Sequence, residues 1–164
     1  GNFYTPGLFR NHSLVLHLAW QNRDSLSGLR FSNNFPFARG YSSESLYRGW
    51  KWGATYHLPL AYPDWGFGNI MYLLRLRSGL FFDQAIGEDP KLLTGFKKHD
   101  FRSTGAELYF DTKWWNQLPV SFGIRYARLL DPDVFGGAGS NRWQFILPLN
   151  LIPAPLNKKR SLNF

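Results

Sequence analysis

Few residues of this sequence are arranged for catalysis or metal binding. His12 and Ser13 could supply a base and a nucleophile, but adjacent residues of an extended chain point to opposite faces. The other histidines, His17, His57 and His99, show no tight ligand spacing, and the chain has no cysteine and no glycine-rich phosphate-binding loop. We therefore expect a protein that is not an enzyme and has neither a cofactor nor a metal site.

Ion pairing is the chemistry that the charged residues offer instead. Arg39 lies in the segment Phe37-Ala38-Arg39-Gly40-Tyr41, and Asp83 ends an apolar stretch. A planar guanidinium can make a bidentate contact with a carboxylate, and glycine permits a sharp bend of the chain. Arg39 and Asp83 are candidates for such a contact; the alternative is that Arg39 is a solvated loop charge and Asp83 a residue at the end of a strand.

The composition requires apolar and polar residues to alternate finely. Of the 164 residues, 44% are hydrophobic and 18% aromatic, yet the mean hydropathy is slightly negative. No run approaches the roughly 20 apolar residues of a membrane-spanning helix. No signal peptide is recognisable, so we expect that Gly1 follows processing or truncation. The net charge of +8 would suit nucleic acid or an anionic surface, so the positions of the charges decide between functions.

Six segments alternate apolar and polar residues with a period of two, which is typical of β-strands. They cover about residues 12–21, 47–60, 69–83, 100–112, 119–129 and 141–151. Each has on the order of ten residues or more, which is longer than an ordinary strand and suits a tilted strand that crosses a bilayer. The sequence therefore predicts an all-β fold, an antiparallel transmembrane β-barrel, with a soluble antiparallel sandwich as the alternative.

The connections between these strands alternate in length, as the external loops and periplasmic turns of outer-membrane barrels do. The long ones are 22–46, 84–99 and 130–140, and the short ones are 61–68 and 113–118. Threaded in this way, the chain places aromatic residues in two interfacial girdles: Trp20, Trp50, Trp52 and Trp143 outside, and Tyr62, Trp65, Trp114 and Trp115 on the periplasmic side. It places charged or titratable side chains inside the barrel: His17, Lys51, His57, Arg75, Arg77, Asp83, Glu107, Arg125 and Arg142. Nucleic-acid binding thereby loses its main support.

Six strands cannot close a barrel, because an open sheet edge in hydrocarbon leaves backbone groups unpaired. Further strands at residues 28–32 and near the N-terminus are an alternative, but 28–32 is too short to span. We therefore expect residues 1–152 to be part of a larger barrel, completed by an N-terminal part of the same precursor or by another chain. Pro153 and Pro155 interrupt the strand pattern, so we expect residues 153–164 to form a C-terminal tail.

The motifs of the first long loop and the third strand resemble those of the bacterial surface antigen family, which includes outer-membrane protein insertases and two-partner-secretion transporters. In that family an Arg-Gly-Tyr or Arg-Gly-Phe loop follows the sixth strand from the end and folds into the lumen. Its arginine meets the aspartate of a Phe-x-Asp motif on the fourth strand from the end. Arg39, Gly40 and Tyr41 stand in the corresponding loop, and Phe81 and Asp83 on the corresponding strand. The resemblance therefore implies that Arg39 pairs with Asp83 inside the barrel. The family usually ends on an aromatic residue that closes the last strand, whereas here prolines precede Phe164.

The resemblance implies the last strands of a roughly sixteen-stranded barrel that serves protein translocation or assembly in the outer membrane of a diderm bacterium. Its expected partners are outer-membrane lipids, the remaining barrel strands and, as a candidate substrate, a polypeptide, but no nucleic acid. The loop 22–46 would enter the lumen as a plug or latch. A passive porin-like or structural barrel is the main alternative, and a barrel-embedded lipase is a less favoured one.

Overall fold

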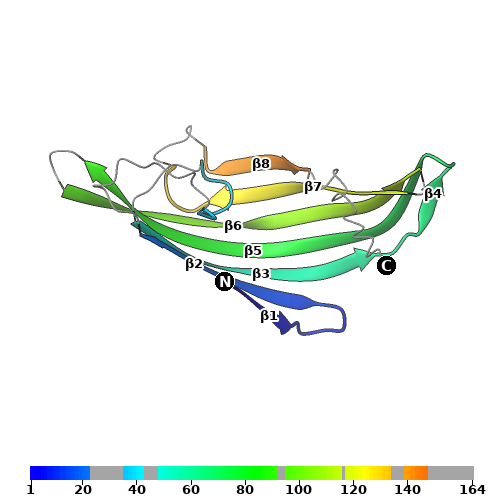
Figure 1. Ribbon diagram of the computed structural model, residues 1–164, viewed down its shortest axis with the longest axis horizontal. Helices are drawn as coiled ribbons and strands as arrows, with labels where there is room; N and C mark the ends of the chain where they lie inside the picture. Colours follow the sequence, from blue (N-terminus) through cyan, green and yellow to red (C-terminus); the bar gives the residue numbers. More distant parts are fainter. Residues whose placement is uncertain (23–34, 43–47, 92–94, 116, 134–138, 148–164) are drawn as a thin grey trace, which may run out of the picture.

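The structure is a computed structural model that describes residues 1–22, 35–42, 48–91, 95–115, 117–133 and 139–147. Within these residues the chain forms eight β-strands and no α-helix (Figure 1). The strands are β1 (Asn2–Pro6), β2 (Ser13–Asn22), β3 (Arg48–Ala61), β4 (Trp65–Phe67), β5 (Met71–Lys91), β6 (Gly95–Trp114), β7 (Leu118–Leu129) and β8 (Asn141–Ile146). The described part of the chain contains no helix long and apolar enough to cross a membrane.

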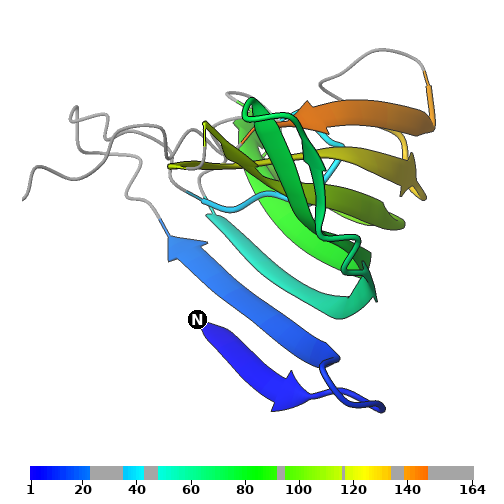
Figure 2. The ribbon, with the colours of Figure 1, turned by 90° about the vertical axis from the view of Figure 1, so that its right-hand side faces the viewer.

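The strands form one antiparallel sheet in the order β1-β2-β3-β5-β6-β7-β8, with the short β4 paired to β5. Apart from β4, each strand lies beside its neighbour in sequence, because a simple turn or loop can join antiparallel strands. Figures 1 and 2 show a curved sheet with β1 and β8 at its two edges. The predicted all-β antiparallel sheet is confirmed, while the described residues form an open sheet and not a closed barrel.

β5 and β6 form a longer hairpin than the sequence predicts. Their pairing continues to Lys91 opposite Gly95, so most of the expected loop 84–99 is strand. The alternation of apolar and polar residues fades in this half of the hairpin, which is why both strands were predicted too short. Residues of opposite charge face each other there, as Glu88 and Lys98 do, and such cross-strand pairs support the extension.

The described residues form eight strands, so the expected number of six is too low: β1 lies near the N-terminus, where a further strand was left as an alternative, and β4 was not expected. β1 has five residues and β4 has three, which is too few for a periodic pattern to be recognised. β2, β3 and β7 begin and end within one residue of the predicted ranges, and β8 begins where expected. Residues 28–32, the end of the last predicted strand at 148–151 and the tail 153–164 lie outside the described residues.

The two faces of the sheet have opposite character. Large apolar side chains are exposed on one face, here called the apolar face: Leu16, Leu18, Trp20, Leu80, Ile124, Trp143 and Phe145. The other face is called the loop face, because residues 35–42 lie over it. On this face Lys51, Asp83, Glu107 and Asp111 are only 0–7% exposed. A soluble sheet has the reverse arrangement, with apolar side chains inside and charged ones outside.

A small apolar core lies between residues 35–42 and the loop face. It consists of Ala38, Tyr41, Ala85, Phe101 and Leu129, with Phe37 packed against it. The Phe101 ring is completely buried, and its centroid lies 4.9 Å from that of Phe37 and 5.3 Å from that of Tyr41 in edge-on contacts. The outer half of the long hairpin, which supplies Ala85 and Phe101, is therefore the surface on which the segment packs.

Candidate functional site

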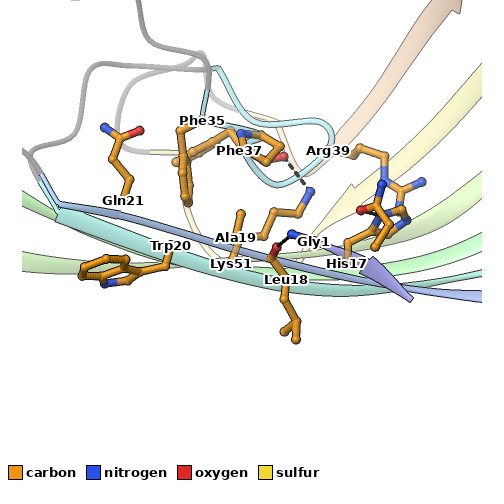
Figure 3. Close-up of a pocket in the computed structure, with 12 residues that line it drawn as sticks. Gly1, His17, Leu18, Ala19, Trp20, Gln21, Phe35, Phe37, Arg39 and Lys51 are labelled. Atoms are coloured by element: carbon orange, nitrogen blue, oxygen red, sulfur yellow. Dashed lines mark hydrogen bonds between the residues drawn. The ribbon is translucent and has the colours of Figure 1, made fainter. Parts of the chain in front are cut away.

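Residues 35–42 cross the loop face and form the centre of the candidate site (Figures 1 and 3). Gly40 has a φ of 90°, a backbone conformation that glycine adopts readily and other residues do not. A Cβ atom at this position would lie 2.8 Å from Cβ of Ala127 and 3.0 Å from Cδ2 of Leu129, both on β7. Glycine is therefore needed here for the bend and also for the close approach to β7.

The Arg39 side chain extends from this segment to Asp83 on β5. Its Nε atom donates to Oδ2 of Asp83 over 2.7 Å and its Nη2 atom donates to Oδ1 over 3.0 Å, which is the expected bidentate geometry. The backbone N–H of Arg39 donates to the same carboxylate over 3.1 Å. The side chain of Asp83 is fully buried and that of Arg39 is 15% exposed. The predicted contact between Arg39 and Asp83 is thus present, and it is shielded from water.

Arg39 has further partners on the loop face. Its Nη1 atom donates to Oε1 of Glu107 on β6 over 3.2 Å, and its Nη2 atom donates to Oγ1 of Thr55 on β3 over 2.7 Å. Its guanidinium carbon lies 4.0 Å from the centroid of the Phe81 ring, which is a cation–π distance. One side chain therefore ties the segment to three strands of the sheet.

Lys51 places a second cation beside Asp83. Its Nζ atom lies 3.4 Å from Oδ2 of Asp83 and donates to the carbonyl oxygen of Phe37 over 2.9 Å (Figure 3). Gly53 faces Asp83 in the register of β3 and β5, and a Cβ atom at Gly53 would overlap Oδ1 of the carboxylate. The glycine thus leaves the space in which the carboxylate meets both cations.

Glu107 continues this network toward β7 and β8. Its Oε1 atom accepts a hydrogen bond from Nε of Arg125 over 2.6 Å, and its Oε2 atom accepts one from the hydroxyl of Tyr109 over 3.1 Å. Arg125 also donates to Oε1 of Gln144 on β8 over 3.2 Å. The whole group, here called the Arg39 network, joins three cations to two carboxylates and carries a net positive charge.

Tyr41 holds the segment at a second place. Its hydroxyl lies 2.7 Å from the carbonyl oxygen of Arg102 and 3.0 Å from that of Asp131, and the N–H of Asp131 donates to it over 3.2 Å. The Arg102 guanidinium also makes a bidentate pair with the Asp131 carboxylate, over 2.9 and 2.8 Å. Hydrogen bonding to this guanidinium holds the pKa of the Asp131 carboxyl below its usual range.

A second charged group lies further along the loop face. Asp111 accepts hydrogen bonds from Arg75, from Nε of Arg77 over 3.0 Å and from the hydroxyl of Ser121 over 2.6 Å. The side chains of Arg75 and Arg77 are 52% and 39% exposed. This group is therefore more open to water than the Arg39 network, and its ion pairs are more strongly screened.

Most of the predicted girdle residues have exposed side chains: Trp20, Trp50, Tyr62, Trp65, Trp115 and Trp143. Trp52 and Trp114 are only partly exposed. The Nε1 atom of Trp52 donates to Oε1 of Gln84 over 3.1 Å, and that of Trp114 donates to Oγ1 of Thr112 over 3.0 Å. Trp20 and Trp50 lie opposite each other near one end of the sheet, and Trp65 and Trp115 lie at the other end, as interfacial girdles would require. Trp143 departs from this pattern, because it faces Tyr126, which is in register with Ala106 and Leu80 in the middle of their strands.

A cavity lies between β2 and residues 35–37, beside the Arg39 network (Figure 3). The side chains of Leu18 and Trp20 extend to the opposite side of β2, toward the apolar face. The Nε2 atom of His17 lies 3.3 Å from Oγ1 of Thr55. The Thr55 hydroxyl oxygen accepts a hydrogen bond from Nη2 of Arg39, so the hydroxyl hydrogen can be donated to Nε2 of His17.

Two residues that the sequence analysis singled out, Arg142 and His12, have partners outside the Arg39 network. Arg142 pairs with Asp133, with 3.4 Å between Nη2 and Oδ2. Nδ1 of His12 lies 2.8 Å from the hydroxyl of Tyr56, so the ring has a partner other than Ser13. Among the described residues, no group of three or more histidine or acidic side chains could hold a metal ion. The contacts of the site serve to bind residues 35–42 to the sheet.

Among the polar partners that sequence reasoning missed in the Arg39 network and around Asp111 are Thr55, Tyr109, Asp111 and Ser121. Asp111 follows Glu107 by four residues, so the period of two already placed both on one face, and this was a usable signal. The other three side chains are uncharged, and the pattern of charges gave no indication of them.

Comparisons with known protein families, with curated proteins and with solved structures gave no match to this chain. The resemblance to the bacterial surface antigen family therefore depends on the motif residues and on their order along the strands.

Proposed function

We propose that this chain is part of the wall of an outer-membrane β-barrel, with the apolar face toward lipid and the loop face toward the lumen. The observation that carries the proposal is that apolar side chains are exposed and charged ones are buried, the reverse of a soluble sheet. Leu18, Trp20 and Trp143 are 51–78% exposed, while Asp83 and Glu107 are 0% and 3% exposed. Lipid would cover the exposed apolar side chains, and a polar lumen can hold charged ones. Aromatic rings at both ends of the sheet suit the two membrane interfaces.

The two edges of the sheet require further strands in this arrangement. β1 and β8 present backbone N–H and C=O groups at the edges, and hydrocarbon offers no hydrogen-bonding partner for them. The remaining wall, from another part of the same precursor or from another chain, would pair with these edges. Outer-membrane lipids and these strands are therefore the proposed partners.

Within this barrel we assign residues 35–42 the role of a lumen segment in a protein translocation or assembly barrel. The Arg39 network binds the segment through buried contacts to β3, β5 and β6, which favours a retained plug or latch over a freely open pore. The resemblance of Arg39, Gly40, Tyr41, Phe81 and Asp83 to the family motifs supports the same role. No catalytic step is proposed.

The orientation of the sheet can be tested with single introduced cysteines, because residues 1–164 contain none. Spin labels at positions 16–21 of β2, in the full-length protein in lipid vesicles, would report accessibility to oxygen and to a water-soluble nickel complex. We expect oxygen to dominate at 16, 18 and 20 and the nickel complex at 17, 19 and 21. The absence of this alternation, or its reversal, would contradict the membrane arrangement.

The role of the segment can be tested by single-channel conductance of the full-length protein. If the segment plugs the lumen, Arg39→Ala should increase the time spent in a conducting state, while the matched control Arg75→Ala should leave it unchanged. Arg75 suits this comparison because Asp111 keeps Arg77 and Ser121 as partners. Steady conductance of the unaltered protein, equal to that of the Arg39 variant, would instead indicate a passive porin-like barrel.

A further inference from the structure

The Tyr41 hydroxyl sits at a junction of three parts of the chain. Tyr41 belongs to the segment over the loop face, Arg102 to β6, and Asp131 to the connection that follows β7. A phenol has one hydrogen, so it donates to one of the two carbonyl oxygens at 2.7 and 3.0 Å and accepts the N–H of Asp131. The packing of the Tyr41 ring on Phe101 does not require a hydroxyl group, so the Tyr41 hydroxyl has a separate role.

An exposed ion pair holds this junction together. The Arg102 guanidinium and its backbone N–H both donate to the Asp131 carboxylate, and the N–H of Leu130 donates to the carbonyl oxygen of Arg102 over 2.9 Å. The Arg102 side chain is 48% exposed, whereas the Asp83 side chain in the Arg39 network is fully buried. Ions or ligands in solution therefore reach the first pair and not the second.

We propose that Tyr41 is a positioning residue whose hydroxyl couples residues 35–42 to the Arg102–Asp131 pair, so that the end of the sheet carrying this pair controls release of the segment. In the membrane this end is the external one, a statement that rests on the proposed function. Release then requires two separate events: breaking the buried contact of Arg39, and freeing Tyr41 from β6 and the end of β7. A ligand or high salt that opens the Arg102–Asp131 pair loosens the segment without reaching the Arg39 network.

Amide hydrogen exchange of the full-length protein measures this coupling directly. The reporter is the N–H of Arg39, which donates to Asp83 and exchanges only when the segment leaves the sheet. Tyr41→Phe removes the hydroxyl and keeps the ring, and we expect exchange about fivefold faster, the effect of one lost hydrogen bond. Tyr126→Phe is the matched control, because its hydroxyl binds Asn141 on β8. Equal rates in both variants would overturn the role of the hydroxyl.

A double substitution tests the link to the ion pair. Asp131→Asn weakens the pair, and we expect it to accelerate exchange at Arg39 by a similar factor in the natural background. In the Tyr41→Phe background the same substitution should have little further effect, because the coupling is already lost. Independent effects that multiply in the double variant would mean that the pair does not act through Tyr41, and the proposal would fail.

This test and that of the membrane arrangement can fail separately. The exchange experiment reports how the segment is held on the sheet and needs no assumption about lipid. Spin labels without alternating accessibility would reject the barrel but leave the coupling intact. If the accessibility of the labels alternates but Tyr41→Phe has no effect on exchange, the coupling is rejected and the membrane arrangement is still supported.

Discussion

Removing the Arg39 side chain should be the most damaging single change on the loop face. Arg39→Ala leaves the fully buried Asp83 carboxylate with Lys51 as its remaining cation, at 3.4 Å and without bidentate geometry. Removal of one partner of a buried ion pair typically costs about 3–5 kcal/mol. Because Lys51 stays and the Arg39 side chain is 15% exposed, we expect the lower end, about 3 kcal/mol.

The assay is reversible urea unfolding of the full-length protein in lipid vesicles, followed by tryptophan fluorescence. Asp83→Ala should also destabilise, since it leaves the Arg39 guanidinium with Glu107 as its main charged partner. The double variant removes both charges, so its loss should be smaller than the sum of the two single losses by about 2 kcal/mol. As a control, Arg75→Ala should cost less than about 1 kcal/mol, because its ion pair is half exposed.

Two results would refute this reasoning. If the single losses add to the double loss within about 0.5 kcal/mol, Arg39 and Asp83 are not coupled energetically. If Arg39→Ala costs no more than Arg75→Ala, the burial of the Asp83 carboxylate has no effect on stability. In either case the segment would be held mainly by its apolar contacts.

Three further predictions concern other parts of the structure. Gly53→Ala should cost about 1–3 kcal/mol in the same unfolding assay, because the added Cβ would displace the Asp83 carboxylate; a neutral effect would show that the carboxylate can move aside freely. Leu18→Arg should impair insertion into vesicles, with a penalty of about 1–2 kcal/mol, below the midplane value because Leu18 is two residues from Trp20 of the outer girdle. His17→Arg, on the opposite face, should be tolerated; equal effects would argue against a lipid-facing side. Because Arg102 lowers the pKa of Asp131, the pair contributes stability above the ordinary carboxyl range that is lost as the pH falls through the lowered pKa. The protection factor of the Arg39 N–H, which corrects for the pH dependence of intrinsic exchange, should therefore fall more on acidification in the natural protein than in Asp131→Asn; identical pH profiles of this factor would contradict the reasoning.

The sequence by itself determined where most strands lie and which face each side chain takes. Both properties are local, because in a strand the side-chain direction alternates with every residue. The alternation of Lys51, Gly53 and Thr55 with Trp50, Trp52 and neighbouring apolar residues was enough to assign the faces of β3. The contact of Arg39 with Asp83 was also expected, but from a resemblance of motifs and not from periodicity.

Only the tertiary structure decided how far the strands extend and what holds the segment over them. The outer half of the β5–β6 hairpin is stabilised by pairing and by the covering segment, so its residues carry no clear alternation of their own. Tyr41 meets Arg102 and Asp131 across 61 and 90 residues of sequence, respectively. Such contacts depend on the curvature and register of the whole sheet, and short-range patterns contain no information about either.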